Sequence, residues 1–358
     1  MDSNKAILDH LDNYKLSKES FLKIIKELTY YHYEKCYSYK SILKKLYKFE
    51  SNNFQIKDLY DVPFIPINLF KNKTLKSIKD EDIYKVLESS GTTGQKTSKI
   101  YLDKFNARIQ SIALSKIFTD FTALKRPNML IIDNPNLLKN PKKFSARLAG
   151  IVGFRALCRK SFFALNSDMS INYEEIENCL STSKDKILVY GFTYIIWLHF
   201  LSDYFPKKLR ELFFKKAILL HGGGWKKLEK LKITQQNFKD KIYERTGIKK
   251  ILNYYGMVEQ TGSIFMECEN GYLHSNPLCD VVPRSLKDIN KVSKDNVGIA
   301  QVISSLPSSY PGHSLLSEDL IEVNNEIKCK CGRIGTSFKV LGRIKTAENR
   351  GCSDTYES

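Results

Sequence analysis

Residues 187–202 read ILVYGFTYIIWLHFLS, the longest run of the chain without a charged residue. A helix that spans a membrane needs about 20 apolar residues, so this run is too short for one. Its first half is typical of a buried strand, and Gly191 interrupts it before a helix-like second half. The run therefore predicts a strand, a turn at residues 190–192 and a helix in a globular α/β protein without a transmembrane segment.

Other short apolar runs surround this one: NMLIID at 128–133, KAILL at 216–220 and IKKILNYY at 248–255. Each run precedes a glycine, a turn or a helical segment. Strands that alternate with helices in this way form a mainly parallel sheet covered by helices. Ligands of such sheets bind beyond the carboxyl ends of the strands, which is where glycines 222–224 and the YGMVE segment fall.

The two ends of the chain have a different character from this middle part. Residues 1–85 place apolar side chains at helical spacing and lead into an extended proline stretch, DVPFIPINLF. After residue 280 short strands, prolines and turns prevail. We expect two domains: residues 1–280, a helical N-terminal segment with the α/β core, and residues 281–358, a small β-rich subdomain with a short tail.

The composition limits the possible partners and the compartment. Lysine and arginine outnumber aspartate and glutamate 57 to 39, a net charge of +18, but the charges are scattered in short clusters such as residues 207–208. Scattered charge favours solvated helix faces over specific nucleic-acid binding. The N-terminus lacks the apolar core of a secretory signal, so we expect a cytoplasmic protein. Its eight cysteines are then metal ligands or nucleophiles and not a disulfide framework.

The segment SSGTTG at residues 89–94 has a composition suited to phosphate binding. Small residues leave backbone N–H groups free to converge on an anion, and hydroxyls add further donors. Gly91 and Gly94 are only three residues apart, so the spacing is not that of a P-loop. The alternative interpretation is a surface turn without a ligand.

Four segments together resemble a known superfamily: SSGTTG, YGMVEQTG, SED and LGRIK occur in the order found in adenylate-forming enzymes. Within that superfamily, VPFIPINLF, YGMVEQ and the ending LGRIKTAENRGCSD resemble the acyl-protein synthetases of the LuxE type. The resemblance implies the layered α/β fold of the adenylating domain without the mobile C-terminal domain. It also implies ATP-dependent activation of a carboxylic acid, of the fatty-acid class, to acyl-AMP and transfer of the acyl group to a thiol.

The same resemblance assigns roles to residues that match the family motifs. Glu259 falls where a carboxylate binds Mg²⁺ on the nucleotide phosphates, and Asp319, with Glu318 as the alternative, falls where a carboxylate binds the ribose hydroxyls. Arg343 matches the hinge arginine that reaches the ribose or phosphate. The remaining nucleotide contacts implied are Ser89, Ser90, Gly91, Thr92, Thr93, Gly94 and Lys96 at the phosphates, and Gly222, Gly223, Gly224, Tyr255 and Gly256 near the adenine or the carboxylate pocket.

Two residues near the C-terminus complete the implied catalytic set. Lys345 is a possible substitute for the lysine that the absent C-terminal domain carries in other superfamily members. Cys352 lies where the resembled family carries the acyl group as a thioester, and nearby basic residues favour the thiolate form. The alternative for Cys352 is a spare thiol at the end of the chain.

A metal site is indicated by cysteine and histidine spacing. Cys268 and His274 are six residues apart, and one residue separates Cys329 from Cys331. Three thiolates and one imidazole would complete a tetrahedral structural zinc site. A similar pairing occurs in the phenylacetate-CoA ligase branch of the superfamily. The alternative is a set of reduced side chains that bind no metal.

Two other functions stay open on the sequence alone. One is an acyl ligase of a surface-glycan or lipid pathway that loads a carrier protein or CoA. The other, of a different class, is a basic protein that binds nucleic acid or a membrane surface and retains only the fold. The implied partners of the leading function are a fatty acid and either an acyl-CoA-type reductase or an acidic acyl carrier protein.

Overall fold

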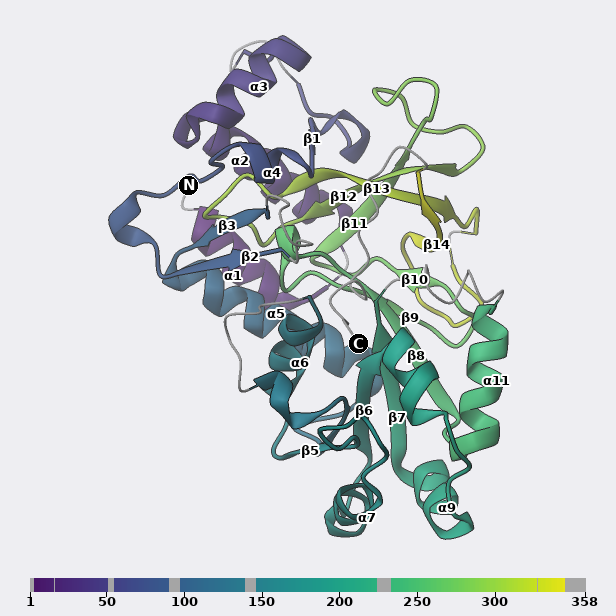
Figure 1. The fold of residues 1–358 in the computed structure, drawn as a ribbon. Coiled ribbons are helices and arrows are strands. Elements are labelled where there is room, and N and C mark those ends of the chain that lie inside the picture. The colour runs from purple at the N-terminus through teal and green to yellow at the C-terminus, as the bar shows by residue number, and fades with distance from the viewer. Residues whose placement is uncertain are drawn as a thin grey trace. The chain divides into compact units, whose positions relative to one another are not determined.

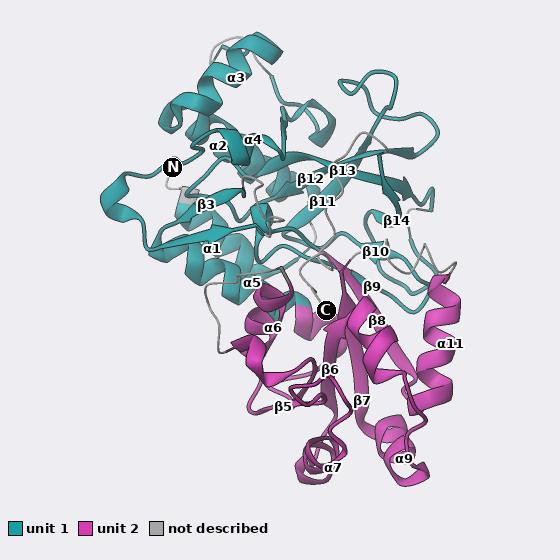
Figure 2. Ribbon diagram, viewed as in Figure 1, with its two compact units in different colours: residues 1–117, 256–348 teal, residues 118–255, 349–358 magenta. Residues whose placement is uncertain are grey.

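Two compact units make up the chain in the computed structural model (Figure 2). Unit 1 comprises residues 1–117 and 256–348, and unit 2 comprises residues 118–255 and 349–358. The structure describes residues 3–15, 17–50, 55–89, 97–138, 146–223, 233–326 and 328–344. Contacts thus place the β-rich segment after residue 280 in one unit with the N-terminal helices. The boundary drawn at residue 280 from sequence character stays a prediction.

Unit 2 is built on a parallel sheet of strand order β8-β7-β6-β4-β5, of which Figure 1 labels β5, β6, β7 and β8. The strands are β4 (Met129–Ile132), β5 (Ser161–Phe163), β6 (Ile187–Phe192), β7 (Ala217–Gly222) and β8 (Lys250–Tyr255). The register aligns Leu130, Val189, Leu219 and Ile251 in one row across four strands, and all four are buried. Such apolar rows are typical of parallel sheets covered by helices. The α/β fold class predicted from the apolar runs is confirmed.

The uncharged run at residues 187–202 folds as strand β6 followed by α8 (Thr193–Ile195) and a π-helical turn, η4 (Ile196–Phe200). Residues 190–192 were expected to form a turn, but Gly191 lies inside β6 and pairs with Ile132 and His221 of the neighbouring strands. The prediction of a turn at residues 190–192 is therefore wrong, because these residues belong to the strand. The strand extends to Phe192 because a buried backbone needs its ladder partners on both sides.

Helices connect the strands of unit 2, and α9 packs against both α7 and α11. Their bounds are η3 (Pro135–Leu138), α6 (Ala146–Arg155), α7 (Tyr173–Thr182), α9 (Lys207–Lys216) and α11 (Gln235–Thr246). Helix α11 begins at a capping box, in which the Thr234 hydroxyl accepts from the Asn237 N–H at 3.1 Å. It ends at Gly247, whose φ of 80° is a left-handed conformation that favours glycine.

Unit 1 contains an antiparallel sheet of strand order β11-β12-β13-β14-β10-β9, and β1 pairs in parallel with β13. A separate hairpin joins β2 (Lys85–Glu88) to β3 (Lys99–Leu102). The other bounds are β1 (Ile65–Pro66), β9 (Phe265–Glu267), β10 (Leu273–His274), β11 (Cys279–Arg284), β12 (Val297–Ser304), β13 (Ser314–Val323) and β14 (Ser337–Arg343).

The helices of unit 1 come mainly from the first part of the chain. They are α1 (Ser3–Asn13), α2 (Lys18–Lys35), α3 (Tyr37–Tyr47), α4 (Leu69–Asn72) and α5 (Lys104–Thr122), with the 3-10 turns η1 (Leu59–Asp61), η2 (Asp80–Asp82) and η5 (Val258–Gln260). The end of α5, from residue 118, belongs to unit 2. Ser17 caps α2, which buries Phe21, Ile25 and Leu28 at helical spacing. No helix within the described ranges combines the length and the apolar character needed to cross a lipid bilayer.

Buried contacts tie the N-terminal part of unit 1 to its C-terminal strands. The ring of His32 in α2 stacks on His313 at 5.1 Å between centroids, and both side chains are fully buried. Thr29 Oγ1 lies 3.0 Å from His313 Nε2. Ile65 of β1 pairs with Leu315 of β13. The sheet of unit 1 is therefore completed by residues from both ends of the chain.

Candidate active site

The predicted magnesium ligand Glu259 lies in the turn η5, which its neighbour Gln260 anchors. Glu259 is only 5% exposed. The Gln260 amide donates to the Val302 carbonyl at 3.0 Å and to the Gly312 carbonyl at 2.8 Å. These bonds join the turn to β12 and to the loop before β13, so the backbone around Glu259 is fixed on both sides. The sequence indicated Glu259 but not Gln260, although both belong to YGMVEQTG.

The electrostatic setting of the Glu259 carboxylate suits a cation. Burial raises the pKa of Glu259, and the adjacent Ser98 hydroxyl lowers it. The charge of Glu318 raises this pKa and the charge of Arg343 lowers it. Within the described residues no lysine or arginine forms an ion pair with Glu259. One buried carboxylate, completed by phosphate oxygens and water, meets the requirements of Mg²⁺. The residues present therefore fit this ion.

The base of the predicted phosphate loop lies next to Glu259. The Ser89 N–H donates to the Ser98 carbonyl at 3.0 Å, and the Ser98 N–H donates to Ser89 Oγ at 2.8 Å. These two bonds close the loop where β2 ends and β3 begins. Residues 90–94 and Lys96 lie outside the described residues. Ser98 was missed by sequence reasoning because it follows the recognisable motif and only the fold brings it beside Glu259.

Asp319 and Arg343 face each other across the antiparallel pair β13–β14. Arg343 Nε donates to Asp319 Oδ1 at 3.3 Å. The Asp319 side chain is 17% exposed and the Arg343 side chain 39% exposed. Asp319, and not the neighbouring Glu318, carries this ion pair. The structure thus brings together the predicted ribose carboxylate and the predicted hinge arginine, in the same unit as Glu259 and the base of the phosphate loop.

The predicted adenine segment begins at the carboxyl end of β7 in unit 2. Gly222 is the last residue of β7, and a Cβ added to it would lie 2.3 Å from the Tyr254 ring. Gly223 has a φ of 93°, and its Cβ would lie 2.5 Å from the Phe192 ring. Neither position accepts a side chain, because the Tyr254 and Phe192 rings pack directly against the glycine backbone.

The remaining predicted residues are placed only in part. Tyr255 is the last residue of β8, at the carboxyl end of the same parallel sheet as Gly222. Gly256 follows it and opens the turn that carries Glu259. Gly224, Lys345 and Cys352 lie outside the described residues.

The predicted metal ligands form one cluster in unit 1. One ligand atom from each of Cys268, His274, Cys329 and Cys331 lies within 4.8 Å of all the others. The Cys268 and Cys329 sulfurs are 4.0 Å apart, and Cys331 Sγ is 3.5 Å from His274 Nε2. A tetrahedral zinc with Zn–S bonds of about 2.3 Å has sulfur–sulfur edges of about 3.8 Å. The cluster therefore has the composition and size that zinc requires.

Strand pairing explains why four residues so far apart in sequence meet. His274 in β10 pairs with Met266 of β9 and with Ser337 of β14. Cys268 follows β9, and the Cys329–Cys331 turn precedes β14. Burial lowers the pKa of His274 to about 4, so the imidazole is neutral at physiological pH, which is the form that binds a metal.

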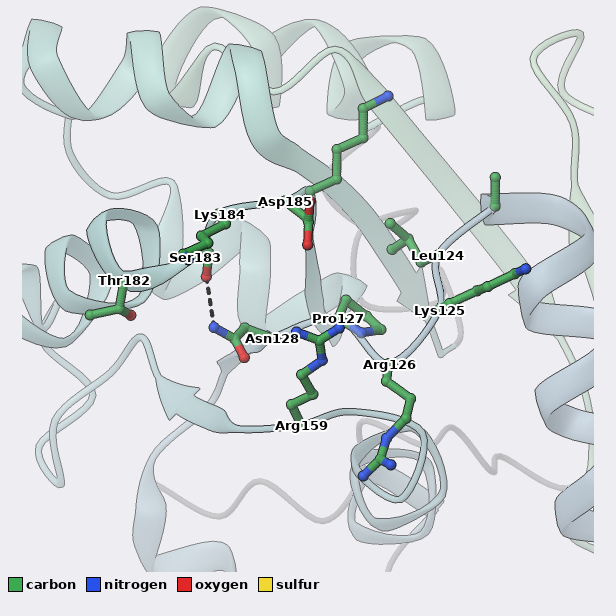
Figure 3. Close-up of a pocket in the computed structure, with 12 residues that line it drawn as sticks. Leu124, Lys125, Arg126, Pro127, Asn128, Arg159, Thr182, Ser183, Lys184 and Asp185 are labelled. Carbon is green, nitrogen blue, oxygen red and sulfur yellow. Dashed lines mark hydrogen bonds between the residues drawn. The ribbon is translucent and has the colours of Figure 1, made fainter.

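Unit 2 also contains a cavity of about 750 Å³, and none of the predicted site residues lines it (Figure 3). It is lined by residues 123–128, Arg159 and residues 182–186, which lie at the amino ends of the parallel strands. In Figure 3 the side chains of Lys125, Arg126 and Arg159 extend in different directions and do not converge on one point. The predicted nucleotide residues Gly222, Gly223 and Tyr255 of this unit lie at the carboxyl ends, where parallel sheets bind ligands. This cavity is therefore not part of the candidate site.

A family model described as "Acyl-protein synthetase, LuxE" matches residues 4–358. The chain belongs to the LuxE acyl-protein synthetase family. This confirms the resemblance carried by the four motifs and the ending. LuxE synthetases are ATP-dependent ligases that form an acyl adenylate, and the chain is therefore an enzyme of this kind. The interpretation as a basic binding protein that retains only the fold is not favoured.

Two relatives carry the name long-chain-fatty-acid–luciferin-component ligase. The relative from Aliivibrio fischeri is 23% identical over 349 residues, which is 94% of this chain and 87% of the relative. The relative from Vibrio harveyi is 23% identical over 351 residues, with the same two coverages of 94% and 87%.

Solved structures show the same fold. An open conformation of 2-hydroxyisobutyryl-CoA ligase with 2-HIB-AMP and CoA has a TM-score of 0.67 and 16% identity, and the match covers 92% of this LuxE chain and 70% of that chain. The postadenylation state of that ligase with 2-HIB-AMP has a TM-score of 0.64 and 15% identity, covering 91% and 68%. The LuxE chain therefore has the fold of an adenylate-forming ligase.

Proposed function

We propose that this LuxE synthetase activates a long-chain fatty acid with ATP and Mg²⁺ and passes the acyl group to its own Cys352. The observation that carries the proposal is the buried Glu259 carboxylate, which has no ion-pair partner among the described residues and lies beside the base of the phosphate loop. The fatty acid is proposed because both relatives named above are long-chain-fatty-acid ligases.

The first step forms the mixed anhydride. A carboxylate oxygen of the fatty acid attacks the α-phosphorus of ATP, the bond between the α- and β-phosphates breaks, and pyrophosphate leaves with the negative charge. Bound Mg²⁺ would neutralise part of that developing charge. Glu259 would hold the ion, the phosphate loop would donate hydrogen bonds to the departing group, and Asp319 with Arg343 would orient the ribose.

The second step transfers the acyl group. The Cys352 thiolate attacks the acyl carbon, the bond from that carbon to the AMP oxygen breaks, and AMP leaves. The thiol proton goes to solvent, because the thiolate is the reactive form. Lys345 is proposed to stabilise the adenylate during transfer. An acyl-CoA-type reductase or an acyl carrier protein is the proposed onward acceptor, in the cytoplasm, where ATP and reduced thiols are available.

Acid-dependent exchange of labelled pyrophosphate into ATP tests the first step. We expect exchange with fatty acids in the presence of Mg²⁺, and mass spectrometry of the products should identify acyl-AMP. No exchange with any carboxylic acid tried would overturn the proposed function.

Hydroxylamine sensitivity tests the second step. Wild type incubated with labelled fatty acid, ATP and Mg²⁺ should carry covalent label that neutral hydroxylamine removes. Cys352→Ser should still form acyl-AMP but carry no label, whereas the control Cys158→Ser should be labelled like wild type. If Cys352→Ser is labelled as well as wild type, the acceptor is another thiol. Transfer to free CoA or to an added carrier protein by Cys352→Ser would support the alternative acyl ligase.

We also propose that the cluster of Cys268, His274, Cys329 and Cys331 binds a structural zinc ion. Protein purified without a histidine tag should contain about one equivalent of zinc, and the double variant Cys329→Ser/Cys331→Ser should contain none. The control Cys158→Ser should keep its zinc. A zinc content below about a tenth of an equivalent in wild type would reject the site.

A further inference from the structure

Tyr310 contacts the main chain of Glu259 directly. Its side chain is fully buried, and its hydroxyl donates to the Glu259 carbonyl at 2.9 Å. Tyr310 lies in the loop at residues 305–313, between β12 and β13, far along the chain from the turn that it contacts. None of the sequence motifs includes it.

The same loop holds the turn at a second point. Gly312 accepts a hydrogen bond from the Gln260 amide at 2.8 Å. A Cβ on Gly312 would lie 2.9 Å from the Glu259 carbonyl oxygen and 2.2 Å from the Tyr310 ring. The loop therefore packs directly on the turn, and only glycine allows this approach. Glu259 and Gln260 are thus both held by residues 310–312.

We propose that Tyr310 is a positioning residue for the adenylation reaction, because its hydroxyl fixes the backbone from which the Glu259 carboxylate reaches the magnesium ion. This inference rests on the role proposed for Glu259. Without the hydroxyl, the Glu259 carbonyl is a buried acceptor that lacks one donor, and the turn shifts to find another. A small shift at the backbone moves the carboxylate oxygens away from the position that the ion and the phosphates require.

Tyr310→Phe removes the hydroxyl and leaves the ring against Gly312. Its matched control is Tyr47→Phe, because the Tyr47 hydroxyl also donates to a backbone carbonyl in unit 1, that of Phe64, at 2.8 Å. Tyr47→Phe also loses the hydrogen bond that its hydroxyl accepts from the Phe64 N–H at 3.1 Å, so it should lower the melting temperature at least as much as Tyr310→Phe does. A purely structural role for Tyr310 predicts no other difference between them.

The deciding measurement is the Mg²⁺ dependence of pyrophosphate exchange at saturating ATP and fatty acid. For Tyr310→Phe we expect the Mg²⁺ concentration at half-maximal rate to rise about three- to tenfold, the effect of one hydrogen bond. For Tyr47→Phe it should stay at the wild-type value. An unchanged Mg²⁺ requirement in Tyr310→Phe would overturn the inference while the proposed function stands.

A second readout separates this inference from the proposed function. The stabilisation of the protein by Mg²⁺ in the presence of ATP is measured by thermal unfolding, without any fatty acid. A smaller Mg²⁺-dependent shift in Tyr310→Phe than in Tyr47→Phe supports the inference even if no acid gives exchange. Equal shifts in the two variants, or no shift in wild type, would overturn it.

Discussion

The turn at residues 256–262 and the strand pair β13–β14 each carry a carboxylate of the candidate site, and they hold it in opposite ways. Glu259 in the turn is 5% exposed and forms no ion pair within the described part of the chain. Asp319 on β13 is more open and pairs with Arg343. A carboxylate that is buried without a counter-ion is prepared for an incoming cation, whereas a paired carboxylate offers its remaining lone pairs to neutral hydroxyls.

The largest expected effect comes from removing the charge in the turn. Glu259→Gln keeps the side-chain shape but removes the charge that holds Mg²⁺ near the phosphates, so exchange should fall by about a hundredfold or more. Pyrophosphate exchange at limiting Mg²⁺ measures this loss. The control Glu322→Gln removes an exposed carboxylate of β13 and should be neutral. Unchanged exchange in Glu259→Gln would remove this residue from the site.

Asp319→Ala should have a smaller effect than Glu259→Gln, and it should weaken ATP binding and not the rate of adenylation. Loss of charge-assisted hydrogen bonds to the ribose should weaken ATP binding by roughly 2 kcal/mol, about thirtyfold, and leave the rate at saturating ATP little changed. The KM for ATP and kcat, measured separately, test this division. If kcat falls and KM stays constant, the two carboxylates act alike and the contrast between turn and strand pair is wrong.

The smallest effect concerns stability, and it has the opposite sign to the effect on activity. Burial raises the pKa of Glu259 above the value of about 4.3 in an unfolded chain. Between the unfolded-state pKa and the higher folded-state pKa, the unfolded chain loses its Glu259 proton while the folded protein keeps it. The folded protein without Mg²⁺ therefore loses stability as the pH rises through these two pKa values. Glu259→Gln should therefore be more stable than wild type by about 1 kcal/mol at pH 7.

The pH dependence of the extra stability of Glu259→Gln tests whether the ionised carboxylate causes it. Denaturant unfolding of the metal-free proteins should show the difference shrinking as the pH falls below about 4.3, where both states of wild type become protonated. Equal stability of the two proteins at pH 7 would mean that the Glu259 carboxylate is compensated within the folded chain.

Sequence reasoning succeeded where a signal is local. Short apolar runs predicted β4, β6, β7 and β8, because burial on both faces leaves a continuous apolar run in the sequence. Glu259 and Asp319 were indicated by motifs that the family resemblance supplied. The four metal ligands were predicted as two local pairs, and the structure brings the pairs together.

The rest depends on contacts between distant segments. Glu259 is held or contacted by Ser98, Gln260 and Tyr310. Serine, glutamine and tyrosine are common residues, and the sequence around them does not indicate a contact with a distant segment. The same limit explains the division at residue 280. Sequence character changes there, while contacts group the β-rich segment with the N-terminal helices through pairs such as Ile65 with Leu315.

The pairing of β1 with β13 has a consequence for how the protein forms during synthesis. Unit 2 is nearly continuous in sequence, so strands β4 to β8 can pair with one another once residues 118–255 leave the ribosome. Strand β1 emerges early but has to wait until β13 is translated. The N-terminal helices meanwhile expose the apolar side chains that the late strands will cover. Chaperone binding to nascent chains that stop before residue 314 should therefore concentrate on the first hundred or so residues.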